Sequence, residues 1–241
     1  VSMAKLQKKV IRIGINAGSL EKDIAVRHGG PVAEALVESA MKNIQFLEEM
    51  DFNAIKVSLK SSDVTTMIEA YRIISERIPY PLHLGVTEAG TILQSAIKSA
   101  IGIGTLLLEG IGDTIRVSVT GDPVPEISVA YGILRAINVR NVGPDIVSCP
   151  TCGRCEVDLP RLVDRIERGL HGMKTPLKIA LMGCVVNGPG EASDADIGLA
   201  GGKDAGMLFV KGKIVRKLRE DEFITVLLEE IRKMEKGLRK T

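Results

Sequence analysis

The sequence has few aromatic side chains and no marked excess of charge of either sign. Aromatic residues make up 3% of the 241 residues and Trp is absent, so a surface that stacks nucleic-acid bases is not indicated. Lys and Arg number 32 against 30 Asp and Glu, and no basic run stands out. This balance gives no electrostatic case for nucleic acid, and we expect no nucleic-acid partner.

Long apolar runs are also missing. The longest candidate, around residues 101–108, is interrupted by Gly102 and Gly104 and falls short of the ~20 apolar residues of a membrane span. No apolar segment follows the charged N-terminus, so it is not typical of a secretory signal. We therefore expect no membrane association and a cytoplasmic location, where the four Cys serve as ligands or redox groups rather than disulfides.

Hydrophobic residues make up 45% of the chain, enough for one large core or two modest ones. Up to about residue 140, segments of strand character alternate with segments of helical periodicity, and such βα repeats indicate a parallel sheet. Four units match half of an eight-stranded barrel or a small open sheet. The predicted strands are 10–17, 54–60, 81–87 and 114–119; the predicted helices are 31–50, 63–78 (with Asp63 as N-cap), 91–108 and 123–137.

Residues 141–144 contain Asn, Gly and Pro and indicate a linker to a smaller α+β region. The domains expected are an N-terminal segment 1–9, a βα domain 10–141 and a second domain 142–241. In the second domain we predict strands 145–148, 178–186, 197–200 and 207–215 (bent at Gly212), a turn at 188–190, and helices 159–169 and 221–238.

Each predicted strand of the βα domain has one apolar and one polar face, because side chains alternate along a strand. The polar faces carry Arg12, Gly14 and Asn16; Lys56, Ser58 and Lys60; His83, Gly85 and Thr87; Arg116 and Ser118. Cations and hydroxyls facing a covered interior are costly unless an anion binds there, so this pattern favours a phosphate site at the C-terminal strand ends. The alternative is a sheet whose polar face is simply solvated.

Glu88 is the only acid among the polar groups at these strand ends. A carboxylate beside cations suits general acid or base catalysis, and it suits a structural counter-ion equally well.

Three of the four Cys form the run Cys149-x₂-Cys152-x₂-Cys155, and Cys184 lies within the predicted strand 178–186. Several thiolates from one tight loop favour an iron–sulfur cluster. A structural zinc site on all four Cys is the alternative, and it would make the protein a non-catalytic metal-binding module. The segment 187–191 is expected to open a helix after this strand, which would place Glu191 near the helix start and close to Cys184.

Taken together, these motifs closely resemble the 4-hydroxy-3-methylbut-2-enyl diphosphate synthases, reductive iron–sulfur enzymes of the non-mevalonate isoprenoid pathway. The resemblance runs in order through nearly the whole chain from residue 10. Its most specific block is the segment from Gly183 to Glu191. The matching blocks are residues 11–23, 52–63, 81–90, 109–118, 149–152 and 183–191.

The resemblance implies a (βα)₈ barrel of the TIM type followed by an α+β iron–sulfur domain. This chain would then hold the C-terminal half of the barrel, about four βα units. It implies a [4Fe–4S] cluster whose ligands fall on Cys149, Cys152, Cys184 and Glu191. Cys155 is not in the family's ligand set and competes with Glu191 as fourth ligand; we favour Glu191, because a carboxylate leaves one iron easily opened.

The implied reaction is the two-electron ring opening and dehydration of 2-C-methyl-D-erythritol 2,4-cyclodiphosphate to the allylic diphosphate. Ferredoxin or flavodoxin is the implied donor, and a homodimer is expected. Because the first half of the barrel has no counterpart here, we expect little activity from this chain alone. Glu88 takes the place of the barrel acid, and the substrate-binding groups fall on Arg12, Asn16, Lys60, Arg116, Ser118 and Asn187.

Overall fold

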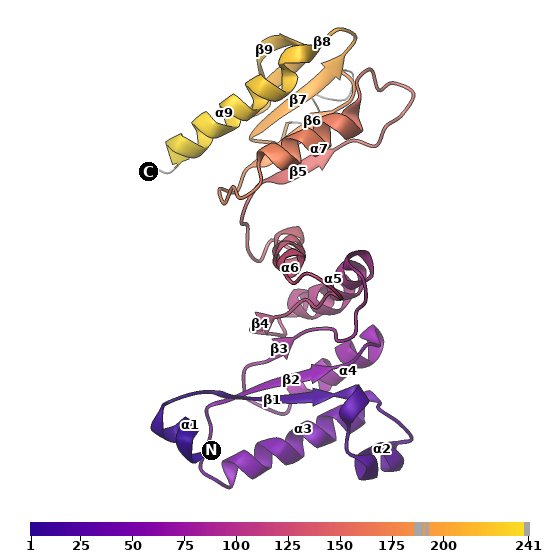
Figure 1. Cartoon of the computed structure of the whole chain (residues 1–241), viewed down its shortest axis with the longest axis vertical. Helices are drawn as coiled ribbons and strands as arrows, with labels where there is room; N and C mark the ends of the chain where they lie inside the picture. Colours follow the sequence, from indigo (N-terminus) through magenta and orange to yellow (C-terminus); the bar gives the residue numbers. More distant parts are fainter. Residues whose placement is uncertain (186–189, 191–192, 239–241) are drawn as a thin grey trace. The chain divides into compact units, whose positions relative to one another are not determined.

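A computed structural model describes residues 1–185, 190 and 193–238 of the chain (Figure 1). Contacts between Cα atoms divide the chain into two compact units, Val1–Arg140 and Asn141–Thr241. Each unit has its own hydrophobic core.

Unit 1 alternates strands with helices, as the sequence predicts. Its elements are α1 (Ser2–Leu6), β1 (Ile11–Asn16), η1 (Ala17–Ser19), α2 (Lys22–His28), α3 (Ala33–Glu48), β2 (Ile55–Lys60), α4 (Val64–Ser75), β3 (His83–Leu84), α5 (Ile92–Leu108), β4 (Thr114–Ile115) and α6 (Val124–Ala136).

The four strands of unit 1 run parallel in the order β1-β2-β3-β4. β1 pairs with β2 along its whole length, from Ile11 opposite Ile55 to Asn16 opposite Lys60. A single parallel bridge, Val57 to Leu82, joins β2 to β3, and β3 pairs with β4. The predicted parallel sheet is therefore confirmed.

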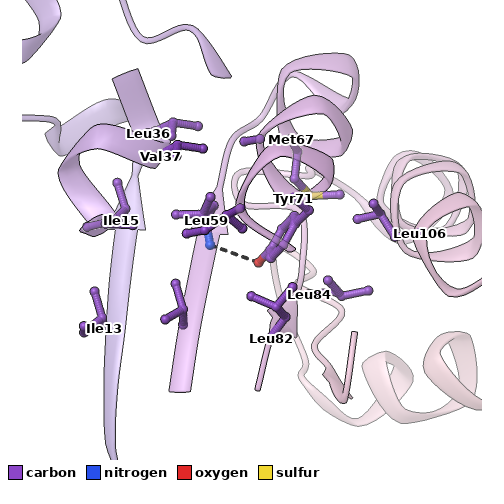
Figure 2. Close-up of a cluster of buried hydrophobic side chains, with 14 of the residues drawn as sticks. Ile13, Ile15, Leu36, Val37, Leu59, Met67, Tyr71, Leu82, Leu84 and Leu106 are labelled. Atoms are coloured by element: carbon purple, nitrogen blue, oxygen red, sulfur yellow. Dashed lines mark hydrogen bonds between the residues drawn. The ribbon is translucent and has the colours of Figure 1, made fainter. Parts of the chain in front are cut away.

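The apolar strand faces lie against the helices, where they form the core of unit 1 (Figure 2). Val57, Leu59 and Leu84 are fully buried, as are Leu36 of α3 and Met67 of α4. The predicted N-cap is also confirmed, because the Asp63 carboxylate accepts a hydrogen bond from the Thr66 N–H at 2.7 Å.

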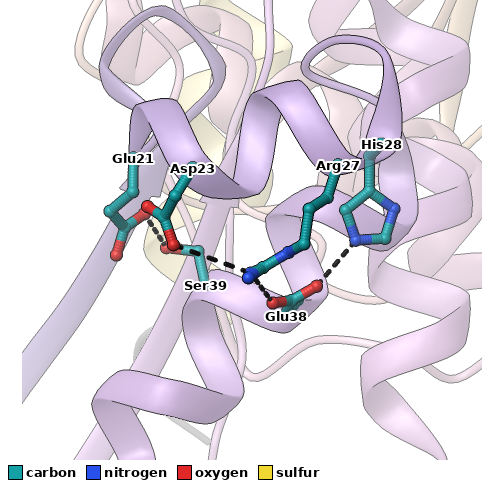
Figure 3. Close-up of polar contacts among 6 residues, drawn as sticks. All are labelled: Glu21, Asp23, Arg27, His28, Glu38 and Ser39. Atoms are coloured by element: carbon teal, nitrogen blue, oxygen red, sulfur yellow. Dashed lines mark hydrogen bonds and ion pairs between the residues drawn. The ribbon is translucent and has the colours of Figure 1, made fainter.

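The connection from β1 to α3 contains helix α2, which the sequence analysis missed. This helix ends at Gly29 and Gly30, both of which have positive φ angles, 72° and 143°. On α3, Glu38 pairs with Arg27 and His28 of α2, and Ser39 donates a hydrogen bond to Glu21 at 2.6 Å (Figure 3). Charged side chains thus contribute to the attachment of α2 to α3. The helix has one buried residue, Ile24, and therefore no apolar stripe that hydrophobic periodicity could reveal.

β3 and β4 each have two paired residues and are shorter than predicted. The chain beyond them stays extended and still forms cross-strand hydrogen bonds, such as Arg116 N–H to the Leu84 carbonyl at 2.9 Å. The predicted polar and apolar faces therefore persist past the regular strand ends.

In its described residues, unit 2 contains a mixed sheet of five strands with the helices α7 and α9. β5, β6 and β7 are parallel, whereas β8 and β9 are antiparallel additions, in the order β5-β6-β7-β8-β9. Its elements are β5 (Asp145–Ser148), α7 (Leu159–Gly169), β6 (Lys178–Met182), β7 (Ile197–Gly202), β8 (Ala205–Val210), β9 (Lys213–Arg219), η2 (Glu220–Glu222) and α9 (Phe223–Leu238).

The prediction of one bent strand over residues 207–215 is wrong. Two strands, β8 and β9, form a hairpin there. Lys211 and Gly212 connect them with positive φ angles of 49° and 73°, the geometry of a two-residue hairpin turn. We took Gly212 as a bend because Lys is a poor turn signal. The strand predicted at 178–186 ends at Met182, and residues 188 and 189 of the predicted turn lie outside the described part.

Candidate functional site

The strand register brings three of the predicted substrate-binding residues to one level of the sheet. Asn16 of β1 lies opposite Lys60 of β2. The Val57–Leu82 bridge, continued three residues along, places Gly85 beside Lys60. The Leu84–Ile115 pair, continued by one residue, places Arg116 beside Gly85. We call Asn16, Lys60, Gly85 and Arg116 the anion row.

Polar atoms of the anion row lack partners in the described part of the chain. Asn16 Oδ1 and Arg116 Nε are buried and form no hydrogen bond there. Burial without a partner costs free energy for an acceptor and for a donor alike. A hydrogen-bond acceptor and a hydrogen-bond donor without partners, at the same level of the sheet, indicate a place where a polar ligand could bind.

The charged side chains of the anion row are all cations. Burial lowers the pKa of Lys60, and the nearby cations Arg116 and Arg12 lower it further. Among the described residues, no carboxylate forms an ion pair with Lys60, Arg12 or Arg116. Cations gathered without acids favour an anionic ligand, which would relieve their mutual repulsion.

His83 lies one level below the row, and both burial and the positive charge of the row lower its pKa. Burial, followed by the field of Arg12 and other cations, lowers its pKa to about 4. The imidazole Nδ1 is 2.8 Å from Thr114 Oγ1. His83 is therefore neutral at pH 7, so it adds a polar group without adding charge. The sequence analysis had assigned this residue no role.

Arg12 and Ser58 connect the first two strands on the polar face. The Arg12 Nη1 group donates a hydrogen bond to Ser58 Oγ at 2.7 Å. A side chain at Gly14 would approach this guanidinium group, since its Cβ would lie 3.4 Å from Arg12 Nη1. The small residues Gly14 and Ser58 thus leave room for Arg12 above the sheet.

Glu88 is exposed in the loop after β3, with a positive φ of 52° that is uncommon for a residue with a side chain. Its carboxylate lies near the turn after β1: Oε1 is 3.7 Å from where a Cβ of Gly18 would stand. Ser118 lies beyond β4, and its carbonyl accepts a hydrogen bond from Ser95 Oγ at 2.6 Å. Both residues therefore lie toward the C-terminal strand ends.

Cys149 and Cys184 follow neighbouring parallel strands of unit 2. Cys149 comes directly after β5 and Cys184 two residues after β6, and these strands pair up to Ser148 and Leu181. The Gly183 N–H donates a hydrogen bond to Cys149 Sγ at 3.3 Å. The structure thus places the two cysteines on adjacent loops at one sheet edge.

The other two cysteines differ from each other in environment. Cys152 is exposed, and hydrogen bonds from Arg154 lower the pKa of its thiol. Cys155 is half-buried, and its thiol donates a hydrogen bond to the Val157 carbonyl at 3.2 Å. Its sulfur also lies so close to Gly183 that it occupies the place of a Cβ there.

In the ranges that the structure describes, no group of three or more His, Cys, Asp or Glu side chains is arranged to hold a metal ion. Two predicted site residues, Asn187 and Glu191, lie outside these ranges. The donors nevertheless suit a thiolate-bound metal group, because loops at one sheet edge carry Cys149, Cys184 and an exposed thiol with a lowered pKa. Among the described helices, none has the length and apolar character to cross a membrane.

Fold and site together define an α/β protein with a row of cations and unpaired polar groups on parallel strands and a cysteine-bearing second unit. Two family models match it in sequence order. The GcpE TIM-barrel domain matches residues 1–131, and the GcpE protein C-terminal domain matches residues 145–233. The chain belongs to the GcpE family, and the first match includes residues 1–9, for which we had found no counterpart.

Curated relatives carry the name that the motifs suggested. A 4-hydroxy-3-methylbut-2-en-1-yl diphosphate synthase (flavodoxin) of Thermodesulfovibrio yellowstonii is 55% identical over 233 residues, which are 97% of this chain and 67% of that protein. A protein of the same name from Clostridium tetani is 56% identical, with 92% of this chain and 64% of that protein covered. A protein of the same name from Nitratidesulfovibrio vulgaris is 54% identical, with 96% of this chain and 60% of that protein covered.

These relatives confirm the resemblance drawn from the motifs. They also show that the chain spans 60–67% of the length of the relatives it matches.

Proposed function

We propose that this chain supplies the anion-binding strands and the cluster domain of a 4-hydroxy-3-methylbut-2-enyl diphosphate synthase. The reaction is the reductive opening of 2-C-methyl-D-erythritol 2,4-cyclodiphosphate, with loss of water, to the allylic diphosphate. The anion row is the observation that carries the proposal, because its cations face no carboxylate in the described chain and two of its polar atoms lack partners.

In this proposal unit 1 is the C-terminal half of a TIM-type barrel, with the domain taken as residues 10–141. Lys60 and Arg116 bind the diphosphate oxygens from either side of Gly85. The Asn16 amide group completes the row and orients the ligand by hydrogen bonding. Arg12 and Ser118 are proposed to extend these contacts, and Asn187 is proposed as a further substrate-binding residue.

Glu88 is the proposed acid. A carboxyl group at the C-terminal strand ends, beside bound diphosphate, can give a proton from its Oε to the departing hydroxyl, which then leaves as water. The left-handed backbone at Glu88 supports a functional role, because such a conformation is sparsely populated by residues with side chains.

The domain of residues 142–241 is proposed to hold a [4Fe–4S] cluster on Cys149, Cys152, Cys184 and Glu191. When bound, such a cluster supplies the two electrons one at a time. Cys155 is left out of the ligand set, because its thiol already donates to the Val157 carbonyl and packs on Gly183. The names of the relatives specify flavodoxin; we propose flavodoxin or ferredoxin as donor here, and a homodimer in the cytoplasm.

Binding of the cyclic diphosphate to the full-length protein tests the proposal. Replacing Lys60 with Met removes one row cation, and we expect the affinity to fall about tenfold or more, the effect of a lost charged hydrogen bond. The matched variant Lys42→Met changes an exposed cation of α3 and should bind as the unaltered protein does. Equal affinity in both variants would refute the anion row.

Metal analysis after anaerobic reconstitution tests the second unit separately. Iron and sulfide in the ratio of a [4Fe–4S] cluster support the redox function. Zinc with no uptake of iron would favour the alternative, a structural site on the four Cys.

A further inference from the structure

Tyr71 connects two strands of unit 1 from within the core. This residue of α4 is fully buried. Its hydroxyl accepts a hydrogen bond from the Leu59 N–H at 3.0 Å (Figure 2). The same hydroxyl donates a hydrogen bond to the His83 carbonyl at 2.5 Å. The phenol therefore stands between backbone groups of β2 and β3.

The Tyr71 hydroxyl lies where the parallel ladder between β2 and β3 would otherwise have a direct backbone hydrogen bond. Below it, the Val57 N–H donates directly to the Pro81 carbonyl at 2.9 Å. Two residues further, the same register directs the Leu59 N–H to the His83 carbonyl. The Tyr71 hydroxyl occupies that path.

Above the inserted hydroxyl, the strands meet again without a change of register. The Thr87 N–H donates to the Ser61 carbonyl at 3.3 Å. This pair keeps the register of the Val57–Leu82 bridge, in which Ser61 lies opposite Val86 and its carbonyl meets the N–H of the next residue, Thr87. The tyrosine therefore widens the sheet locally and leaves the side chains on their proper faces.

Only a neutral phenol can fill this gap from α4. It must accept from one backbone group and donate to another, and a phenolate could not donate. Burial raises the pKa of Tyr71 far above its ordinary value, which keeps the hydroxyl protonated.

The two hydrogen bonds of the Tyr71 hydroxyl lie directly beside the anion row. Leu59 precedes Lys60 in β2, and His83 lies two residues before Gly85 in the next strand. Two hydrogen bonds in series separate the strands more than one direct bond does. The distance between Lys60 and the groups across Gly85 therefore depends on the Tyr71 hydroxyl.

We propose that Tyr71 is a positioning residue for the anion row: by standing in the β2–β3 ladder, its hydroxyl sets the width across which Lys60 and Arg116 hold an anion. This inference rests on the proposed function, and it adds a buried residue that touches no ligand.

Titration with inorganic pyrophosphate tests the inference in the 241-residue chain, without need of a cluster or turnover. Tyr71→Phe removes only the hydroxyl. Two controls match it: Tyr80→Phe removes an exposed hydroxyl bonded to Glu48, and Ile74→Val trims a buried residue of the same helix. We expect affinity for pyrophosphate to fall about tenfold in Tyr71→Phe, the size expected for one displaced charged hydrogen bond. Both controls should stay within about twofold, less than the loss of one such bond.

The outcomes separate the two proposals. Binding by the unaltered chain and equal binding by Tyr71→Phe would overturn the role of Tyr71 while leaving the anion row intact. An equal loss in Ile74→Val would also overturn it, since general loosening of α4 would then explain the effect. Failure of the unaltered chain to bind would overturn the anion row, and the role of Tyr71 with it.

A measurement on the unaltered chain covers the case in which Tyr71→Phe does not fold. A hydrogen bond transmits a scalar coupling between donor nitrogen and carbonyl carbon. We expect this coupling for Val57 to Pro81 and none for Leu59 to His83, together with a close contact between the Leu59 amide proton and the Tyr71 hydroxyl proton. A direct Leu59–His83 coupling would overturn the insertion.

Discussion

The Cβ atom that Gly85 lacks would stand 2.8 Å from the carbonyl oxygen of Arg116. No side chain fits at this point of the sheet without moving the backbone of the neighbouring strand. Gly85 therefore allows the chain after β3 and the chain after β4 to approach closely at the level of the anion row.

Gly85→Ala should destabilise unit 1 by about 1–3 kcal/mol, the usual cost of overpacking a close contact. Thermal unfolding of the variant measures this loss. Gly104→Ala is the matched control, because nothing lies within 4 Å of a Cβ at this position in α5. Alanine is a better helix former, so this control should be more stable by roughly 0.5–1 kcal/mol. Equal behaviour of the two variants would show that the close approach is absent.

His83 should make the stability of the protein depend on pH. Its pKa of about 4 in the folded state lies below the ordinary histidine value of 6.5. Between these two pH values the unfolded chain binds a proton that the folded chain does not, so stability falls as the pH drops from 6.5 to 4. His83→Gln should flatten this part of the curve, as measured by denaturant unfolding at pH 5 and pH 7.

The control for this prediction is His28, which lies on the surface beside Glu38. His28→Gln should leave the slope that His83 produces in place. An unchanged slope in His83→Gln would mean that His83 is charged in the folded protein. Binding of an anion to the row should in turn raise the pKa of His83, because the bound charge offsets Lys60 and Arg116.

Glu38 should control the attachment of α2 (Figure 3). The hydrogen bond from His28, followed by the charge of Arg27, lowers the pKa of its carboxyl group. Its contribution is therefore complete above the ordinary glutamate pKa and is lost as the pH falls through the lowered value. Glu38→Gln should speed amide hydrogen exchange in α2 at pH 7 while leaving the core of unit 1 protected.

Glu34→Gln provides the comparison, since it removes an exposed acid from the first turn of the same helix. It should leave exchange in α2 unchanged. If both variants behave alike, the attachment of α2 does not depend on the Glu38 ion pairs.

The polar faces of unit 1 were predictable because alternation along a strand needs no knowledge of the partner strands. Arg12, Asn16, Lys60 and Arg116 could be assigned to one face in this way. Their meeting at one level could not, because register depends on hydrogen bonds between strands that the sequence does not specify. The inserted Tyr71 hydroxyl was invisible for the same reason: as a buried helix residue it looks like ordinary core.

Unit 2 shows where sequence patterns failed. The helix 159–169 was predicted with its observed bounds, since Asp158 caps it and its apolar residues follow helical spacing. The β8–β9 hairpin was not predicted, because Lys211 adopts a left-handed conformation that is not typical of lysine. Cys155 likewise looked like a possible ligand from spacing alone, and only its contacts with Val157 and Gly183 favour a packing role.

Cys155→Ala should therefore retain the iron and sulfide of the reconstituted protein, whereas Cys184→Ala should lose them. The Cys155 thiol donates a hydrogen bond to the Val157 carbonyl, and a thiolate ligand would have no proton to donate there. The measurement is iron and sulfide content together with the electron paramagnetic resonance spectrum of the reduced protein. Retention in Cys184→Ala with loss in Cys155→Ala would instead place Cys155 in the ligand set, and would require the loop after β5 to turn its sulfur away from Gly183.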